Sequence, residues 1–114
     1  MKIDLVQDKR VLALRADGRS FGAIARELCL EDAATAYAAY QQALWNAPPL
    51  RRASLQLQEI ERLDRLAAQL REQDAGGEPH AAGRLVAIER LRTLQLAEWL
   101  DRVAELADRA ELSG

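Results

Sequence analysis

The chain has 114 residues, of which 49% are hydrophobic and 30% are charged, so it has room for one modest domain, or for a very small domain with an extended helical segment. That size argues against an enzyme with a deep pocket in a large core. The formal net charge of −2 indicates no general affinity for nucleic acid, so any DNA contact must come from a local patch.

The first predicted helix covers residues 4–16, where apolar residues recur with near-helical spacing and an acidic residue suits the first turn. Gly18 ends it. Ser20 suits the N-cap of a second helix over residues 21–28, whose apolar residues lie at i, i+3, i+4 and i+7. Those four residues are Phe21, Ile24, Ala25 and Leu28.

A third, Ala-rich helix is predicted from Asp32, which suits its N-cap, to about Asn46. Cys29 lies in the short connection before it, and we expect Cys29 to be a small buried residue in a tight turn. The two prolines at positions 48 and 49 stop the third helix, because proline lacks the amide donor and disfavours helical geometry in the preceding residue. The predicted domain therefore covers residues 1–47, with a Pro-containing linker at residues 48–52.

Residues 53–114 are predicted to form a long antiparallel helical hairpin, so the expected fold is all-α. Apolar residues repeat at three- and four-residue spacing from about residue 50 to 73. Two glycines and a proline then break the pattern, and Pro79 suits the first turn of a last helix that continues to about Leu112. This last helix spans about 50 Å at 1.5 Å per residue, which is longer than its predicted partner helix.

The apolar stripe of the last helix therefore needs a further partner, and another copy of the chain is the obvious one. The predicted oligomerisation residues are Leu85, Ile88, Leu91, Leu96, Trp99, Val103 and Leu106. An exposed Trp99 would suit the centre of an interface.

Three short helices with a Gly-bearing turn fit the helix-turn-helix plan, in which the third helix enters the major groove of DNA. The candidate DNA contacts are Arg19, Ser20, Thr35, Tyr37, Gln41, Gln42, Arg51 and Arg52. All of these except Arg19 have a second interpretation. The third-helix residues can form a plain solvent face, Ser20 an ordinary cap, and Arg51 and Arg52 a cap for the next helix.

The segment from Gly18 to Leu28 reads Gly-x-Ser-Phe-x-x-Ile-Ala-x-x-Leu, and an Ala-Tyr-rich helix follows it. This pattern resembles the N-terminal module of phage terminase small subunits and related bacterial helix-turn-helix proteins. The likeness continues through residues 60–66, 77–79 and 86–90, and covers residues 10–92. It implies DNA recognition by the N-terminal module, assembly of several copies through the hairpin, and a large subunit as the partner that carries the ATPase and nuclease.

The sequence departs from that family in its charge. The helix from residue 33 to 47 has no charged residue where family members commonly carry Arg or Lys, and Cys29 stands where a turn glycine is usual. Residues 1–47 contain six basic and six acidic residues. Because phosphate contacts usually dominate DNA affinity, we expect weak binding per copy and a need for several copies acting together.

Two alternatives stay open beside a packaging subunit: a small dimeric helix-turn-helix transcriptional regulator, and a protein-interaction module that has lost DNA binding.

No enzymatic activity is expected, because the carboxylates are interleaved with arginines on polar helix faces. No metal or cofactor is expected either. His80 is the only histidine and is expected at the surface. Without a second cysteine for a disulfide, and with no apolar run of about 20 residues, the chain is expected to be cytoplasmic, in a bacterium or a phage-infected cell.

Overall fold

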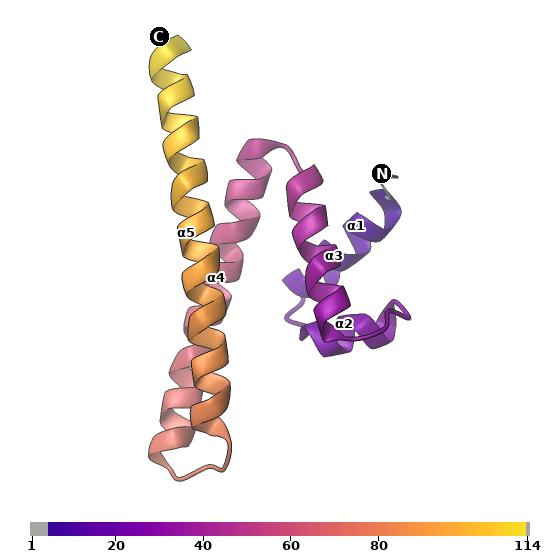
Figure 1. Ribbon diagram of the computed structural model, residues 1–114, viewed down its shortest axis with the longest axis vertical. Coiled ribbons are helices and arrows are strands. Elements are labelled where there is room, and N and C mark those ends of the chain that lie inside the picture. The colour runs from indigo at the N-terminus through magenta and orange to yellow at the C-terminus, as the bar shows by residue number, and fades with distance from the viewer. Residues whose placement is uncertain (1–4, 114) are drawn as a thin grey trace. The chain divides into compact units, whose positions relative to one another are not determined.

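The computed structural model describes residues 5–113, and in these residues it consists of helices and turns without a strand (Figure 1). The helices are α1 (Leu5–Ala16), α2 (Phe21–Glu27), α3 (Ala33–Asn46), α4 (Pro49–Ala75) and α5 (Ala81–Ser113). The expected all-α class is therefore confirmed. The helix start expected at residue 4 lies outside the described residues. Among the described helices, none has both the length and the apolar composition that crossing a bilayer requires.

The chain divides into two compact units, one ending at Arg52 and one beginning at Ala53. Residues 49–52 belong to the first turn of α4 and do not form the separate linker that the two prolines suggested. The reason is that a proline in the first helical position loses no hydrogen bond, because that amide has no partner within the helix. Pro49 therefore starts α4, and the carbonyl of Pro48, just before the helix, accepts a hydrogen bond from the Arg52 amide at 2.8 Å.

In the first unit, α1 and α2 both pack against α3. Ile24, Ala25 and Ala36 form a buried cluster at the meeting of α2 and α3. Val11 of α1 is also fully buried, as the helical pattern predicted for its apolar side. Small residues on α3 allow the close approach, so two short helices hold one face of α3.

Three helices end in the same hydrogen-bonded motif, in which the chain turns through a left-handed residue. At the end of α1 and of α4, this residue is Gly18 (φ 90°) and Gly77 (φ 80°). At the end of α2 it is Cys29, with φ 56°. The amide of Leu30 donates to the carbonyl of Ala25 at 2.8 Å, and the Cys29 amide donates to the carbonyl of Arg26 at 3.4 Å.

Cys29 is exposed, so the expectation that it is buried was wrong. In this motif the left-handed residue projects outward, while the residue after it, Leu30, packs on the Ile24 cluster. A side chain with a Cβ is disfavoured at a positive φ, because its Cβ approaches the following carbonyl oxygen. The turn between α2 and α3 therefore carries backbone strain that its two glycine counterparts avoid.

In the second unit, α4 and α5 run in opposite directions around a turn at residues 76–80 (Figure 1). Ile60, Leu63, Ala67 and Leu70 of α4 are buried at the predicted three- and four-residue spacing. Arg71 contacts Glu89 at 3.1 Å, and Arg92 pairs with Asp64. These contacts fit a hairpin.

The last helix starts at Ala81, two residues after the predicted start at Pro79. Pro79 and His80 form a turn instead, in which the Ala81 amide donates to the carbonyl of Glu78 at 3.4 Å. His80 has φ 69°, and a left-handed residue cannot continue a right-handed helix. His80 is exposed, as predicted.

A polar group crosses the hairpin core between α4 and α5. Gln56 and Gln95 are both 0% exposed. The Nε2 of Gln56 donates to Oε1 of Gln95 at 3.4 Å and to Oε2 of Glu98 at 3.2 Å. The Nε of Arg102 donates to Oε1 of Gln56 at 2.7 Å. Gln56 therefore ties α4 to three α5 residues that lie one or two turns apart.

Replacing Cys29 with glycine is expected to stabilise the first unit by about 1 kcal/mol. The change removes the energetic penalty of a side chain at a positive φ, and this gain exceeds the loss that comes from the greater flexibility of glycine in the unfolded chain. Gly18→Ala is the matched control and should destabilise the same unit, since nothing lies within 4 Å of its added Cβ and the effect is conformational. Amide hydrogen exchange of α2 and α3 measures both changes. Faster exchange in Cys29→Gly would contradict the inference that Cys29 strains the turn between α2 and α3.

Gln56→Leu is expected to destabilise the hairpin by about 1–3 kcal/mol, because it removes one partner from the buried amide of Gln95 and from the partly buried Arg102. Gln58→Leu changes an exposed neighbour on α4 in the same way and should have little effect. Amide exchange in α4 and α5 checks the difference. Equal protection in the two variants would show that the polar group does not hold the helices together.

Candidate nucleic-acid interface

The third helix has one buried and one exposed face. Its buried residues are Ala36, Tyr40, Ala43 and Leu44. The opposite face exposes Ala34, Ala38, Gln42 and Trp45, with Gln41 partly exposed beside them. Trp45 is 66% exposed. The helix that would enter a groove of DNA therefore offers small side chains, two amides and one indole, with no charge.

Arg19 and Ser20 stand at the start of α2, and the structure gives Ser20 a capping role. The Ser20 hydroxyl accepts a hydrogen bond from the Ala23 amide at 3.1 Å. The Arg19 carbonyl accepts one from the Arg15 guanidinium at 3.0 Å. Both Arg19 and Ser20 are exposed, and Arg19 directly precedes the N-cap residue of α2.

Thr35 belongs to the cap of α3. Its amide donates to Oδ1 of Asp32 at 2.8 Å, and its hydroxyl donates to the same oxygen at 2.7 Å. These two hydrogen bonds lower the pKa of the Asp32 carboxyl below its usual value, since they stabilise the ionised form. The hydroxyl proton of Thr35 is thus directed at the cap and away from any DNA.

Tyr37 packs with the aromatic ring of Phe21. The ring centroids are 5.2 Å apart and the planes meet at 82°, an edge-to-face arrangement that stabilises such pairs. On the same Phe21 ring, the Arg15 guanidinium lies 3.8 Å from the centroid. Tyr37 therefore helps to hold α3 against α2, and its ring is not presented as a whole to solvent.

Gln41 and Gln42 lie on the open side of α3, in the part that the helix-turn-helix interpretation assigns to DNA bases. Gln42 donates to Oδ1 of Asn46 at 3.2 Å, and Asn46 donates to Oδ2 of Asp8 at 3.0 Å. This chain of amides links the end of α3 to α1. Gln42 is exposed, so its amide can still be reached from solvent.

Arg51 and Arg52 have different environments. Arg52 donates to the carbonyls of Trp45 at 2.8 Å and Ala47 at 2.9 Å, and its guanidinium lies 5.0 Å from the centre of the Trp45 ring. It therefore caps the end of α3, the preceding helix, and not the helix that it belongs to. Arg51 is exposed and remains a candidate for backbone contact.

Exposed charge in the first unit is balanced. Within residues 5–52 the exposed basic residues number five and the exposed acidic residues four. The basic set is Lys9, Arg10, Arg19, Arg26 and Arg51, and the acidic set is Asp17, Glu27, Glu31 and Asp32. Exposed charge in this unit therefore gives no excess of basic residues that would suit a phosphate backbone.

The packing roles of two residues, Arg15 and Gln56, were not predicted from the sequence. Arg15 is only 6% exposed and joins the end of α1 to Phe21. Its place in the last turn of a predicted helix, three residues before a glycine, was the available signal. Gln56 falls on the three-and-four pattern of the α4 core, and a polar residue at such a position indicates a buried polar contact.

The predicted oligomerisation residues divide between two faces of α5. Ile88, Leu91 and Leu106 lie on the side of Gln95 and Arg102, which face α4. Leu85, Leu96 and Val103 lie on an adjacent side, and Trp99 lies between the two. All seven are partly or fully exposed in the single chain, so α4 covers none of them completely.

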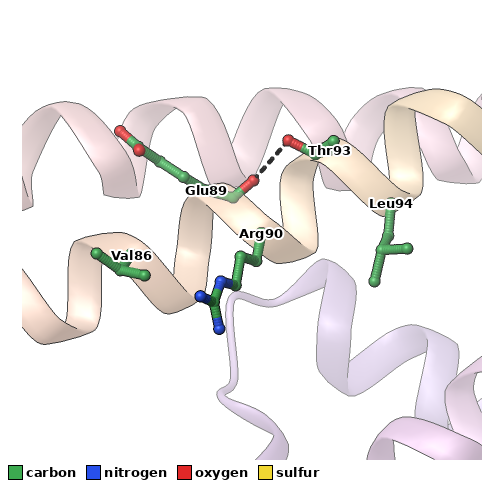
Figure 2. Close-up of a pocket in the computed structure, with 5 residues that line it drawn as sticks. All are labelled: Val86, Glu89, Arg90, Thr93 and Leu94. Atoms are coloured by element: carbon green, nitrogen blue, oxygen red, sulfur yellow. Dashed lines mark hydrogen bonds between the residues drawn. The ribbon is translucent and has the colours of Figure 1, made fainter.

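A shallow hollow on α5 is lined by Val86, Glu89, Arg90, Thr93 and Leu94 (Figure 2). The Thr93 hydroxyl donates to the Glu89 carbonyl of its own helix at 2.9 Å. Among the described residues, no group of three or more His, Cys, Asp or Glu side chains is placed to hold a metal ion. This part of the α5 surface therefore combines apolar and polar side chains along one helix.

Asp32→Asn is expected to remove part of the acid sensitivity of the first unit. The folded pKa of Asp32 lies below its usual value of 3.8, so its contribution to stability is full above that value and is lost as the pH falls through the folded pKa. Unfolding of the first unit, followed at neutral pH and at progressively lower pH, should show a smaller loss in the variant. The control is Glu31→Gln, which removes a neighbouring carboxylate that no cap uses, and an equal change in both variants would refute the role of the cap.

Comparison with known proteins assigns no family to this geometry: no family model, no curated protein and no solved structure matches the chain. The resemblance of residues 10–92 to terminase small subunits therefore stays an expectation from the sequence.

Proposed function

We propose that this chain is a DNA-recognition protein of the kind that phage terminase small subunits exemplify. In this proposal the first unit is a helix-turn-helix module, α3 reads the DNA, and the hairpin assembles copies of the chain. The chain itself carries out no catalysis. Its partners are DNA, further copies of itself and, if it serves in packaging, a large subunit with the ATPase and nuclease.

The observation that carries the proposal is the position of α3. A short turn after α2 leads directly into it, α1 and α2 hold its buried face, and Gln41 and Gln42 lie on the open side. A recognition helix needs this arrangement, because it must be held rigidly from behind while its front enters the groove. Glutamine can pair with adenine, and alanine can contact the methyl group of thymine.

Two further features support a weak, multivalent mode of binding. Arg19, Arg26 and Arg51 are exposed basic residues of the first unit that can contact phosphates. Exposed acidic residues nearly balance them, so a single copy lacks a strong basic patch. Linking two modules raises the local concentration for the second binding event, and assembly through the hairpin would supply this gain.

A protein-interaction module is the second candidate, and the exposed Trp45 favours it. Trp45 is 66% exposed and has Arg52 stacked beside it. Tryptophan and arginine are common at the centres of protein interfaces, and the uncharged α3 face would suit a protein partner better than a phosphate backbone. Under this function the unaltered protein would retain no duplex DNA even at low salt.

Gln41→Glu combined with Gln42→Glu is expected to weaken DNA binding by about tenfold or more at low salt, because it places two negative charges where the proposal puts the bases and phosphates. Fluorescence anisotropy with labelled duplex DNA measures the change. Gln58→Glu with Gln69→Glu alters the net charge equally, at two exposed α4 positions, and should leave binding nearly unchanged. Equal losses in both double variants would mean that α3 is not the reader.

A further inference from the structure

The α5 helix carries a second repeat of three- and four-residue spacing on a side adjacent to the one that Gln95 occupies. We call it the outer stripe, and it consists of Val86, Glu89, Thr93, Leu96, Leu100, Val103 and Ala107. Leu100 is 53% exposed and Val86 is 49% exposed. A repeat of this kind along one helix is the pattern by which helices pair over a long distance.

The two polar members of the outer stripe do not prevent close packing. The Thr93 hydroxyl is bonded to the carbonyl of Glu89, within its own helix, so its methyl group is available for apolar contact. The Glu89 carboxylate is engaged by Arg71 of α4 at 3.1 Å. Their polar groups already have partners within one chain, which lowers the cost of covering them.

Charge along α5 is strongly asymmetric. Residues 81–97 contain three basic residues and one acidic residue, a net charge of 3 − 1 = +2. Residues 98–113 contain two basic and five acidic residues, a net charge of 2 − 5 = −3. Arg90 and Asp101 are both exposed. They are 11 residues apart, about three helical turns, and so lie along the same flank of the outer stripe.

We propose that the outer stripe pairs with the outer stripe of a second copy of this chain running in the opposite direction. Antiparallel pairing puts the basic half of each α5 beside the acidic half of the other. Parallel pairing would put the two acidic halves together, which electrostatic repulsion disfavours. In helices paired antiparallel, the same flanks face each other, so Arg90 of each copy comes close to Asp101 of the other.

This inference rests on the self-assembly part of the proposed function and makes it specific. Antiparallel pairing of one stripe with itself has two-fold symmetry, and a two-fold contact closes after two copies. The outer stripe therefore makes a dimer. A ring of many copies would need a second, different contact surface.

Sedimentation equilibrium of the full chain, without DNA, tests the pairing. Arg90→Asp is expected to raise the dimer dissociation constant by about tenfold, and Asp101→Arg is expected to do the same. The two changes combined should restore dimerisation, because each pair is re-formed with its charges exchanged. Arg65→Asp, at an exposed position of α4, is the matched control and should have little effect.

Orientation is tested by cysteine cross-linking in a Cys29→Ala background. Val86→Cys and Ala107→Cys lie near opposite ends of the outer stripe, so a mixture of the two variants should form a mixed disulfide while neither variant alone links to itself. Self-linking of Ala107→Cys would indicate parallel pairing and overturn the proposal. A monomer at high concentration would overturn it too, whether another part of the chain or a different protein covers the stripe, and so would a dimer unaffected by the charge changes.

The pairing of α5 helices and the recognition of DNA can be refuted independently of each other. A charge-sensitive antiparallel dimer that binds no duplex DNA would leave this inference standing and remove DNA recognition. A monomer that binds DNA through Gln41 and Gln42 would remove the pairing alone.

Discussion

The buried amide of Gln56 is the constraint on which the second unit depends. Because it is fully buried, its donors and its oxygen must be satisfied by protein groups, and Gln95, Glu98 and Arg102 of α5 supply them. Apolar contacts alone tolerate a shift of one helix along another, but a shift of one turn would leave this amide without partners. The polar contact therefore fixes which side of α5 faces α4, and so which side remains outside as the outer stripe.

In the first unit, polar side chains stabilise the ends of helices instead of fixing how two helices pack. Its helices are short, so their ends account for much of the backbone, and polar side chains satisfy those ends. Ser20 and Asp32 cap two N-termini, and Arg52 closes the end of α3. Polar groups that hold the fold are less available to a ligand. The open side of α3 therefore presents Gln41, Gln42 and Trp45 among alanines, without a charged side chain.

Local signals in the sequence predicted the helices and several of their ends. The caps at Ser20 and Asp32 and the stop at Gly18 follow from the chemistry of neighbouring residues, and the structure confirms them. Contacts between distant residues could not be predicted in this way. Arg15 on Phe21 and Gln56 with Gln95 depend on how helices pack. The helix α5 starts at Ala81 and not at Pro79, because His80 has a positive φ. The preference of Pro79 for a first helical turn could not predict this turn.

The charge asymmetry of α5 bears on the choice between a packaging subunit and the dimeric transcriptional regulator that the sequence also allows. A packaging ring and a dimeric regulator can share the same recognition module, so the module does not decide between them. Two-fold pairing through the outer stripe would relate two modules by the symmetry that an inverted DNA repeat also has. Antiparallel pairing thus favours a dimeric regulator over a ring, unless a second surface joins the dimers. The distribution of charge along one helix, more than the residues of α3, separates the two functions.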